Sequence, residues 1–219
     1  MKMRNWLFCI LIIMGIATTT HADTVLLDDN FNFENGGIGW AGDYTGFENW
    51  TVTAGFVDLA GYGSWDFLNT GEPYAEYVDM DGGRYTAGTL TSKKSFNLTP
   101  GTVLLQFDLA GPNRGADVEY YDTNVVRVIF ENFSEDFTLY WNDPFTTYSR
   151  YINITTAASA HLIFQSIYEQ DQDGNYGDNT GALLDNVKLT VTSVPEPTTM
   201  LLLGLGLMGL AGVRRKFQK

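Results

Sequence analysis

The chain has 219 residues, of which 26 are acidic and 13 are basic, so its net charge is −13 at pH 7. A surface this acidic repels nucleic acid and anionic lipid, and the composition therefore excludes nucleic acid as a partner. The length suits one domain with a sizeable core once terminal targeting segments are set aside.

The N-terminus has the parts of a secretory signal peptide. Lys2 and Arg4 give a basic start, residues 6–17 are apolar, and Thr20 and Ala22 are small residues at the positions of a cleavage site. We therefore expect residues 1–22 to be a signal peptide that is cleaved before Asp23. An uncleaved anchor is the alternative, but a membrane-spanning helix needs about 20 apolar residues and this run is shorter.

Removal of the signal peptide limits the chemistry of the remaining chain. Residues 1–22 contain Cys9, the only cysteine, and His21, one of the two histidines. The mature chain would form no disulfide, and His161 alone excludes sites that need two histidines, including most zinc sites. Between residues 23 and 194, 7 basic and 25 acidic residues leave a net charge of −18, which attracts cations.

Residues 23–192 are predicted to form one domain made of short strands. In the clearest strand, 102–109, the apolar residues Val103, Leu105, Phe107 and Leu109 share one face. This period of two recurs between turns, and no segment sustains a helical period. The pattern predicts an all-β fold, an antiparallel β-sandwich of the jelly-roll type. The other predicted strands are Trp50–Thr53, Phe56–Leu59, Ala75–Asp79, Gly88–Ser92, Asn124–Glu131, Asp136–Trp141, Thr147–Ile154, His161–Tyr168 and Ala182–Thr192.

One acidic residue interrupts the apolar face of the last predicted strand. Regular alternation places Asp185 on the same face as Leu183 and Val187, where a carboxylate is costly unless it is paired, hydrogen-bonded or bound to metal. Asp28 and Glu34 flank the first strand, which in jelly rolls often lies beside the last. Because Ca²⁺ prefers oxygen ligands, we expect Asp28, Glu34 and Asp185 to hold a structural Ca²⁺. The alternative is that Asp185 accepts backbone N–H groups at a sheet corner.

Aromatic residues are abundant in the N-terminal half of the chain. The segment 62–66 has the composition of a loop, and it could present Tyr62 and Trp65 outward. Because sugar rings stack on flat aromatic faces, we predict that Tyr62 and Trp65 bind carbohydrate. The alternative is that most of these rings fill the sandwich core, where aromatic residues are common.

Catalytic motifs are poorly represented, and we predict that the protein is not an enzyme. The sequence has no G-x-S-x-G nucleophile motif, and His161 lies beside Leu162 in an apolar strand. Carboxylate pairs are frequent, but they arise by chance in so acidic a chain. A secreted glycosidase stays open as the alternative, because the carboxylate separation that it requires is not visible in a sequence.

The C-terminus has three successive parts. Pro195, Glu196 and Pro197 come first, and the two prolines keep the backbone extended and accessible. Residues 198–213 are apolar and can enter a bilayer as a transmembrane helix. The basic cluster Arg214-Arg215-Lys216 follows and is expected to stay on the cytoplasmic side. We therefore predict a sorting or anchoring tail at 193–219, with the domain outside.

The order of these three parts resembles the PEP-CTERM sorting signal of Gram-negative bacteria that produce exopolysaccharide. The resemblance implies recognition by an exosortase, a membrane-embedded cysteine transpeptidase, which removes the tail. A permanent C-terminal anchor is the alternative. Residues 88–92, 107–111 and 181–187 also resemble galactose-binding-like jelly rolls. That resemblance implies a fold of the carbohydrate-binding-module type and a structural calcium at the place described above.

Together these features predict an exported protein that is transiently anchored in the inner membrane and processed by exosortase. We expect it at the cell surface or in the extracellular matrix of a Gram-negative bacterium. It is expected to bind extracellular polysaccharide through its jelly roll. A purely structural or adhesive surface protein that binds no sugar is the alternative.

Overall fold

The computed structural model describes residues 22–37, 39–61, 75–82, 86–112, 123–167 and 181–192, together with Gly204 and Gly206. It divides into two units, residues 24–192 and the two chain ends taken together. Apart from Ala22, the predicted signal peptide lies outside the described residues. The predicted tail also lies outside them, apart from Gly204 and Gly206, which have a helical backbone. In the described part of the chain, no helix has the length and apolar character needed to cross a membrane.

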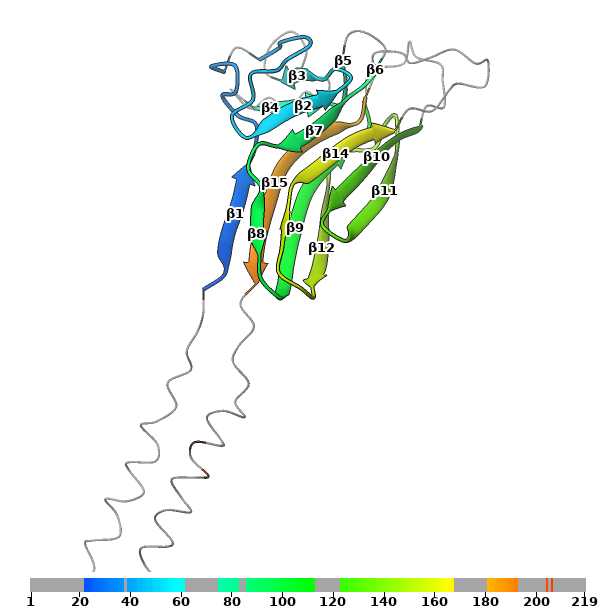
Figure 1. Cartoon of the computed structure of the whole chain (residues 1–219). Coiled ribbons are helices and arrows are strands. Elements are labelled where there is room, and N and C mark those ends of the chain that lie inside the picture. Colours follow the sequence, from blue (N-terminus) through cyan, green and yellow to red (C-terminus); the bar gives the residue numbers. More distant parts are fainter. Residues whose placement is uncertain are drawn as a thin grey trace, which may run out of the picture. The chain divides into compact units, whose positions relative to one another are not determined.

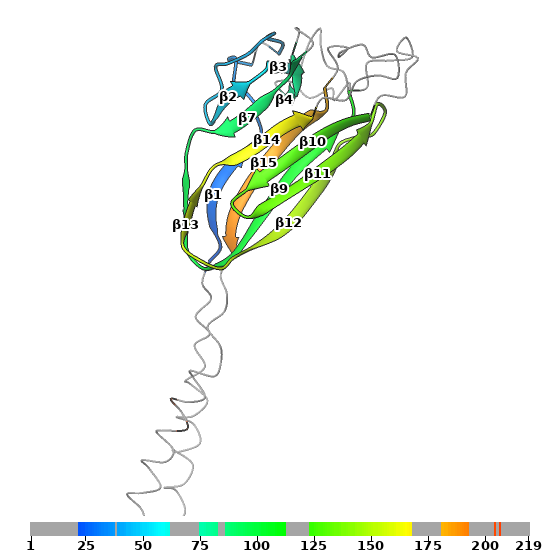
Figure 2. The same ribbon diagram turned by 45° about the vertical axis from the view of Figure 1, so that its right-hand side comes forward.

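Residues 24–192 form two antiparallel sheets that pack face to face (Figures 1 and 2). In the six-stranded sheet the order is β12 (Thr146–Ile154), β9 (Gly101–Ala110), β15 (Leu183–Thr192), β4 (Glu76–Asp79) and β3 (Asp58–Gly61), and β1 (Thr24–Asp29) also pairs with β15. In the five-stranded sheet the order is β11 (Phe133–Tyr140), β10 (Thr123–Phe130), β14 (Leu162–Ile167), β7 (Thr89–Ser92) and β2 (Trp50–Ala54). The predicted antiparallel β-sandwich of the jelly-roll type is confirmed.

The core lies between the two sheets and follows the predicted alternation. Val103, Leu105, Phe107 and Leu109 are all buried, as are the residues of β10 that face them. Phe107 is central, because its ring centroid lies 5.2 Å from that of Phe137 and 5.3 Å from that of Phe164. Full burial of one such side chain stabilises the fold by about 1.5–3 kcal/mol, so these contacts hold the two layers together.

Four short strands were not predicted, and two predicted strands start more than one residue away from the observed start. The short strands form two-stranded pairs, β5 (Asp81–Gly82) with β6 (Thr86–Ala87), and β8 (Phe96–Leu98) with β13 (Ala158–Ala160). The predicted strand Asp136–Trp141 is β11, which begins earlier, at Phe133. The predicted strand Phe56–Leu59 is β3, which begins later, at Asp58. The backbone carbonyls of Phe56 and Val57 accept hydrogen bonds from Gly82 and Tyr44, so these residues join a loop. The hydrophobic periodicity of a sequence does not reveal hydrogen bonds to residues that are distant along the chain.

Strand β15 departs from regular alternation at Asn186, and this corrects the predicted position of Asp185. Asp185 lies opposite Asp108 on β9, whereas Lys188 lies opposite Gln106, so β15 has one extra residue at this point. Asn186 has a φ of 50°, which is typical of a residue in a β-bulge or turn. The bulge changes which residues face inward.

The consequence is visible in the packing on either side of the bulge. Leu184, Val187 and Leu189 are in the core, while Leu183 belongs to a separate apolar cluster with Ala110. Asp185 therefore does not share a face with Val187, because the inserted residue reverses the alternation between them.

The first and last strands of the domain lie side by side, as expected. Thr24 lies opposite Val191, and Asp28 lies opposite Lys188. The start of β1 and the end of β15 are therefore neighbours at one end of the sandwich (Figures 1 and 2).

Candidate functional site

The outer face of the five-stranded sheet carries a row of polar side chains that crosses four strands. Arg127 on β10 lies opposite Asp136 on β11 and opposite Gln165 on β14, and Gln165 lies opposite Thr89 on β7. The inward residues of β10 that flank Arg127, Val126 and Val128, are buried in the core. Since side chains of a strand alternate between faces, the polar row points away from the core.

Aliphatic side chains lie on both sides of the polar row. Ile129 lies opposite Ile163 on one side, and Val125 lies opposite Ile167 on the other. The three isoleucines are half-buried on this face. The face thus alternates hydrogen-bonding groups with apolar surface, which is the mixture that a sugar chain presents through its hydroxyl and C–H groups.

Arg127 and Asp136 form a two-pronged ion pair. Nε of Arg127 donates to Oδ1 of Asp136 at 2.6 Å, and Nη2 donates to Oδ2 at 2.7 Å. The hydrogen bonds and the charge of Arg127 hold the pKa of Asp136 below its usual range. This two-pronged contact holds the pair in one geometry. Because the two side chains are 40% and 44% exposed, their remaining N–H groups and oxygen lone pairs are open to a ligand.

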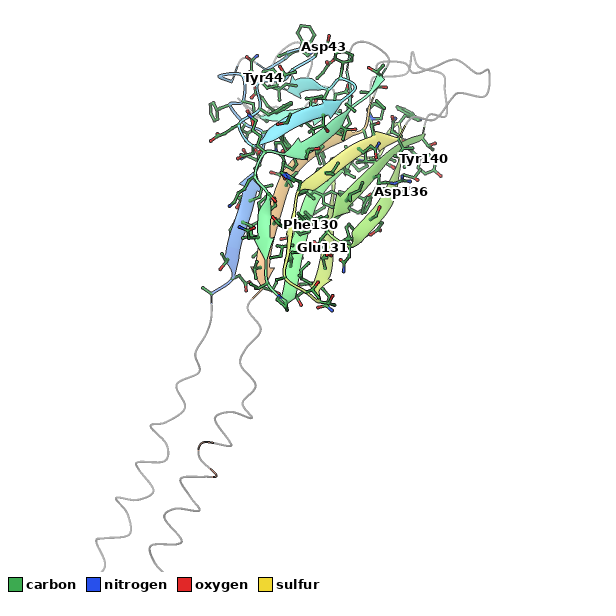
Figure 3. All side chains as sticks on the ribbon, in the orientation of Figure 1. Asp43, Tyr44, Phe130, Glu131, Asp136 and Tyr140 are labelled. Atoms are coloured by element: carbon green, nitrogen blue, oxygen red, sulfur yellow. The ribbon has the colours of Figure 1, made fainter. Side chains whose placement is uncertain are left out.

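Hydroxyl groups and one exposed ring complete this face. Tyr140 lies four residues after Asp136 on β11, so both side chains are on the same face of the strand (Figure 3). Its side chain is 60% exposed. At the opposite side of the sheet, the Oγ1 atoms of Thr53 and Thr91 lie 2.9 Å apart. These groups can exchange hydrogen bonds with a ligand or stack on it.

The outer face of the five-stranded sheet is electrically balanced, although the domain is strongly acidic. The five strands contain three charged residues, namely Arg127, Glu135 and Asp136. Arg127 neutralises Asp136, and Glu135 accepts two hydrogen bonds from Arg150 of β12, at 2.5 and 2.6 Å. The strands of this sheet therefore present no unbalanced charge to a ligand.

The three predicted calcium ligands are not gathered around one point. Oδ2 of Asp28 lies 2.6 Å from Nζ of Lys188, and the Asp28 side chain is 62% exposed. Glu34 accepts a hydrogen bond from the backbone N–H of Glu48 at 2.7 Å. Within the described residues, no three acidic, histidine or cysteine side chains are arranged to hold a metal ion.

Asp185 lies at the bulge, opposite Asp108 of β9. Its Oδ1 accepts a hydrogen bond from the backbone N–H of Asn186 at 2.7 Å, which is the alternative that the sequence left open. Nδ2 of Asn186 also donates to Oδ2 of Asp108 at 2.8 Å. Burial is the main cause that raises the pKa of Asp185 to about 7, and the negative charges of Asp108 and Asp29 add to it.

Asp29 is the carboxylate whose charge acts on both Asp185 and Glu34, and it is not among the three calcium ligands predicted from the sequence. It is 8% exposed and accepts hydrogen bonds from the backbone N–H of Phe31 at 2.9 Å and from Nε1 of Trp50 at 2.8 Å. Its charge raises the pKa of Asp185, and after burial it also contributes to the raised pKa of Glu34. Alternation along β1 could have identified it, because Asp29 shares a face with the core residue Leu27.

A further buried carboxylate, Glu76, lies in the same neighbourhood. Its side chain is fully buried, and its Oε1 accepts a hydrogen bond from the backbone N–H of Gly39 at 3.0 Å. Oε2 has no hydrogen-bond partner among the described residues. Glu34 and Glu76 both contribute to the raised pKa of Tyr44, after burial, so the two carboxylates lie close to the same ring.

The remaining predicted site residues lie outside the described part of the chain. These are Tyr62 and Trp65 of the predicted carbohydrate platform and the six residues of the predicted sorting motif. The alternative that aromatic residues fill the core is correct for Trp50 and Tyr77, which are fully buried or nearly so. Trp40, in contrast, is 44% exposed.

Comparison with protein-family models identifies the C-terminal segment. Residues 193–216 match the PEP-CTERM protein-sorting motif. This range contains the Pro-Glu-Pro segment and the basic cluster, and the predicted resemblance is confirmed there. The motif indicates an exported protein with a C-terminal membrane-anchoring tail. A search of curated proteins found no relative that matches the chain.

Solved structures similar to the chain include carbohydrate-binding modules. A family 29 carbohydrate binding module has 14% identity and a TM-score of 0.37, over 80% of this chain and 94% of that one. The CBM22-1 xylan-binding domain from Paenibacillus barcinonensis Xyn10C has 12% identity and a TM-score of 0.39, over 80% and 99%. The enzymatically active domain of bacteriophage CBA120 tailspike protein 4 has a TM-score of 0.39, but only 21% of it is covered. At these scores, the fold assignment rests on the strand order of the chain itself.

Proposed function

We propose that this protein is processed by an exosortase and released to the cell surface or extracellular matrix of a Gram-negative bacterium, where its sandwich binds a neutral polysaccharide. The sorting motif at 193–216 supports the first part of the proposal. The outer face of the five-stranded sheet supports the second part. The single observation that carries it is the balanced polar row, in which Arg127 lies between Asp136 and Gln165.

The charge balance of this face favours an uncharged ligand. A ligand with many carboxylates would meet a domain of net charge −18, and at distances within the Debye length of about 8 Å the repulsion would oppose binding. A neutral glycan meets no such penalty. Its hydroxyls can exchange hydrogen bonds with the guanidinium of Arg127, the amide of Gln165 and the threonine hydroxyls, while the isoleucines contact its C–H groups.

A binding role fits this face better than a catalytic one. A glycosidase needs one carboxyl group that can donate a proton and a second at a set separation. Among the described strands of the five-stranded sheet, the outward carboxylate is Asp136, and Arg127 keeps it ionised by lowering its pKa. The ion pair therefore suits recognition of hydroxyls rather than proton transfer.

We further propose that a structural Ca²⁺ stabilises the region around Asp29, Glu34 and Asp185. The support is that the charge of Asp29 contributes, after burial, to the raised pKa of both Glu34 and Asp185. Glu76 adds a buried oxygen that has no hydrogen-bond partner among the described residues. Asp29 replaces Asp28 in this proposal, because Asp28 is exposed and paired with Lys188. When bound, the ion would neutralise carboxylates that otherwise repel one another.

Among the described residues, each outer face of the sandwich has one cross-strand ion pair, and this offers a matched test of polysaccharide binding. Affinity gel electrophoresis of protein from its native host would use embedded xylan, glucomannan or mixed-linkage β-glucan, with anionic alginate for comparison. We expect Arg127→Ala to weaken retardation by a neutral glycan about tenfold or more, because hydrogen bonds to charged groups contribute about 1.5–3 kcal/mol. Lys188→Ala, on the other face, should have no effect. Equal retardation of all three proteins, or retardation by alginate alone, would contradict the proposed ligand.

Intact-mass measurement tests the processing of both chain ends. Protein from the native host should begin near Asp23 and end near Pro195–Pro197, and a strain without exosortase should retain the tail. A mass that includes residues 198–219 in the wild-type host would contradict exosortase processing.

A further inference from the structure

The strand that leads into the sorting motif is paired on both sides up to Val191 and on one side at its last residue, Thr192. Thr192 lies opposite Thr102 of β9, and Val191 lies opposite both Val103 of β9 and Thr24 of β1. The Oγ1 of Thr192 also donates to the carbonyl of Thr102 at 3.0 Å. The sorting motif begins at the next residue, 193, so the ladder ends where the motif starts.

This arrangement conflicts with the way in which a processing enzyme takes hold of a peptide. An extended peptide is bound largely through its backbone N–H and C=O groups. In β15 those groups are engaged by neighbouring strands on both sides. Only Ser193 and Val194 lie between Thr192 and Pro195, and three steps along the chain at about 3.3 Å each span at most about 10 Å. An enzyme that acts near Pro195 therefore meets the folded domain.

The two neighbours of β15 differ in how firmly they hold it. β9 has ten residues and is flanked by β12 and β15 inside the sheet. Among the described strands, β1 pairs only with β15, and its register is irregular between Val25 and Leu27. Its first residues are exposed, and Val25 is 50% exposed. The start of β1 is the side of the ladder that opens most easily, because few apolar contacts retain it.

We propose that the first residues of β1, Thr24 and Val25, act as a clamp on the end of β15 and set the rate at which the exosortase obtains its substrate. The inference rests on the proposed function, since it requires exosortase processing. In that reaction a peptide bond beyond Thr192 breaks. The acyl group on the N-terminal side of that bond becomes bonded to the nucleophile of the enzyme, and the tail leaves with a new α-amino group. Water or an acceptor amine then takes the acyl group and frees the nucleophile. Opening of β1 frees backbone groups of Val191 before that step.

A reversible covalent lock tests the clamp. Thr24→Cys with Val191→Cys joins register partners, and the exported chain has no other cysteine because Cys9 belongs to the signal peptide. We expect the oxidised full chain to lose its tail several-fold more slowly than the wild type in a pulse-chase immunoblot. Dithiothreitol should restore the rate. A flexible Gly-Ser spacer after Thr192 should restore it even when the lock is closed, because the motif then stands clear of the ladder.

A disulfide between register partners on another pair of strands serves as the control. Gln106→Cys with Ser149→Cys joins register partners on β9 and β12, on the side of β9 that faces away from β15, and should leave processing unchanged. Unchanged processing of the locked Thr24–Val191 variant, with its disulfide verified, would overturn the clamp alone. Equal slowing by both disulfides would also overturn it. Loss of the tail in a strain without exosortase would overturn the proposed function, and the clamp with it.

Discussion

The two outer faces of the sandwich each carry an aspartate on a strand, and the pKa values of the two aspartates move in opposite directions. Asp136 lies opposite Arg127, and its pKa is lowered. Asp185 lies opposite Asp108, and its pKa is raised to about 7, mainly by burial. The comparison teaches that the residue type alone does not set the charge of a sheet face. Burial and the residue directly across the ladder decide it.

The largest expected effect concerns the pH dependence of stability through Asp185. Because its pKa is raised from 3.8 to about 7, the folded protein binds more protons than the unfolded chain between those values. In calcium-free buffer, the free energy of unfolding should therefore fall as pH rises from about 4 to 7, by at most about 4 kcal/mol, and level off above.

Asp185→Asn removes that titration while keeping the shape of the side chain. The variant should match the wild type near pH 4 and exceed its stability at pH 8, as measured by urea denaturation. Asp136→Asn provides the contrast, because the pKa of Asp136 is lowered and its loss should not stabilise the protein at pH 8. An Asp185→Asn profile parallel to that of the wild type would show that Asp185 titrates normally.

The next largest effect should be the increase in stability on adding calcium, and it should depend on the carboxylates around Asp29. A cation that binds the folded state alone raises stability by about 2.7 kcal/mol at 100 times its Kd, and should raise the Tm by several degrees. Asp185→Asn and Glu34→Gln should each reduce the calcium-specific shift, since an amide is a weaker ligand for a hard cation.

Two controls isolate that calcium effect from general screening of an acidic surface. Mg²⁺ at the same concentration reports the screening, and Asp28→Asn should keep the full calcium shift because Asp28 pairs with Lys188. Differential scanning calorimetry of the four proteins would be sufficient. Equal shifts with Ca²⁺ and Mg²⁺ would argue against a specific site.

A smaller loss of ligand affinity is expected when an exposed tyrosine is removed, and it should depend on which sheet carries the tyrosine. Tyr140 is 60% exposed on the five-stranded face, and Tyr151 is 73% exposed on β12 of the other sheet. We expect Tyr140→Ala to weaken binding of a neutral polysaccharide about three- to tenfold, because one aromatic contact contributes about 0.5–1.5 kcal/mol. Tyr151→Ala should leave affinity unchanged in isothermal titration. The opposite ranking would move the binding face to the six-stranded sheet.

The smallest effect is expected for stability when either surface ion pair is removed. Arg127→Ala and Lys188→Ala should each change the free energy of unfolding by less than about 1 kcal/mol, because exposed ion pairs are screened and weak. Urea denaturation at low and high salt would measure the difference. A large loss for Arg127→Ala would mean that its effect on binding reflects unfolding rather than recognition.

Residue pattern alone was sufficient for the strands and for the sorting tail. In β9 the alternation of Val103, Leu105 and Phe107 with polar residues sets which side is buried, and this depends only on neighbours along the chain. The tail is recognised in the same local way, from Pro195 to Lys216. Tyr62 and Trp65 stay a prediction, since they lie outside the described residues.

The candidate site, in contrast, depends on which strands become neighbours. Arg127 meets Asp136 through a turn of the chain, but Gln165 reaches Arg127 from 38 residues away, and no local pattern specifies that register. Asp185 was misplaced because one extra residue at Asn186 reverses the alternation, and the extra residue becomes visible only against its partner β9. Periodicity determined which residues are buried within each strand, because burial follows from local alternation. Tertiary structure decided which charges face each other, because pairing joins residues that are distant in the sequence.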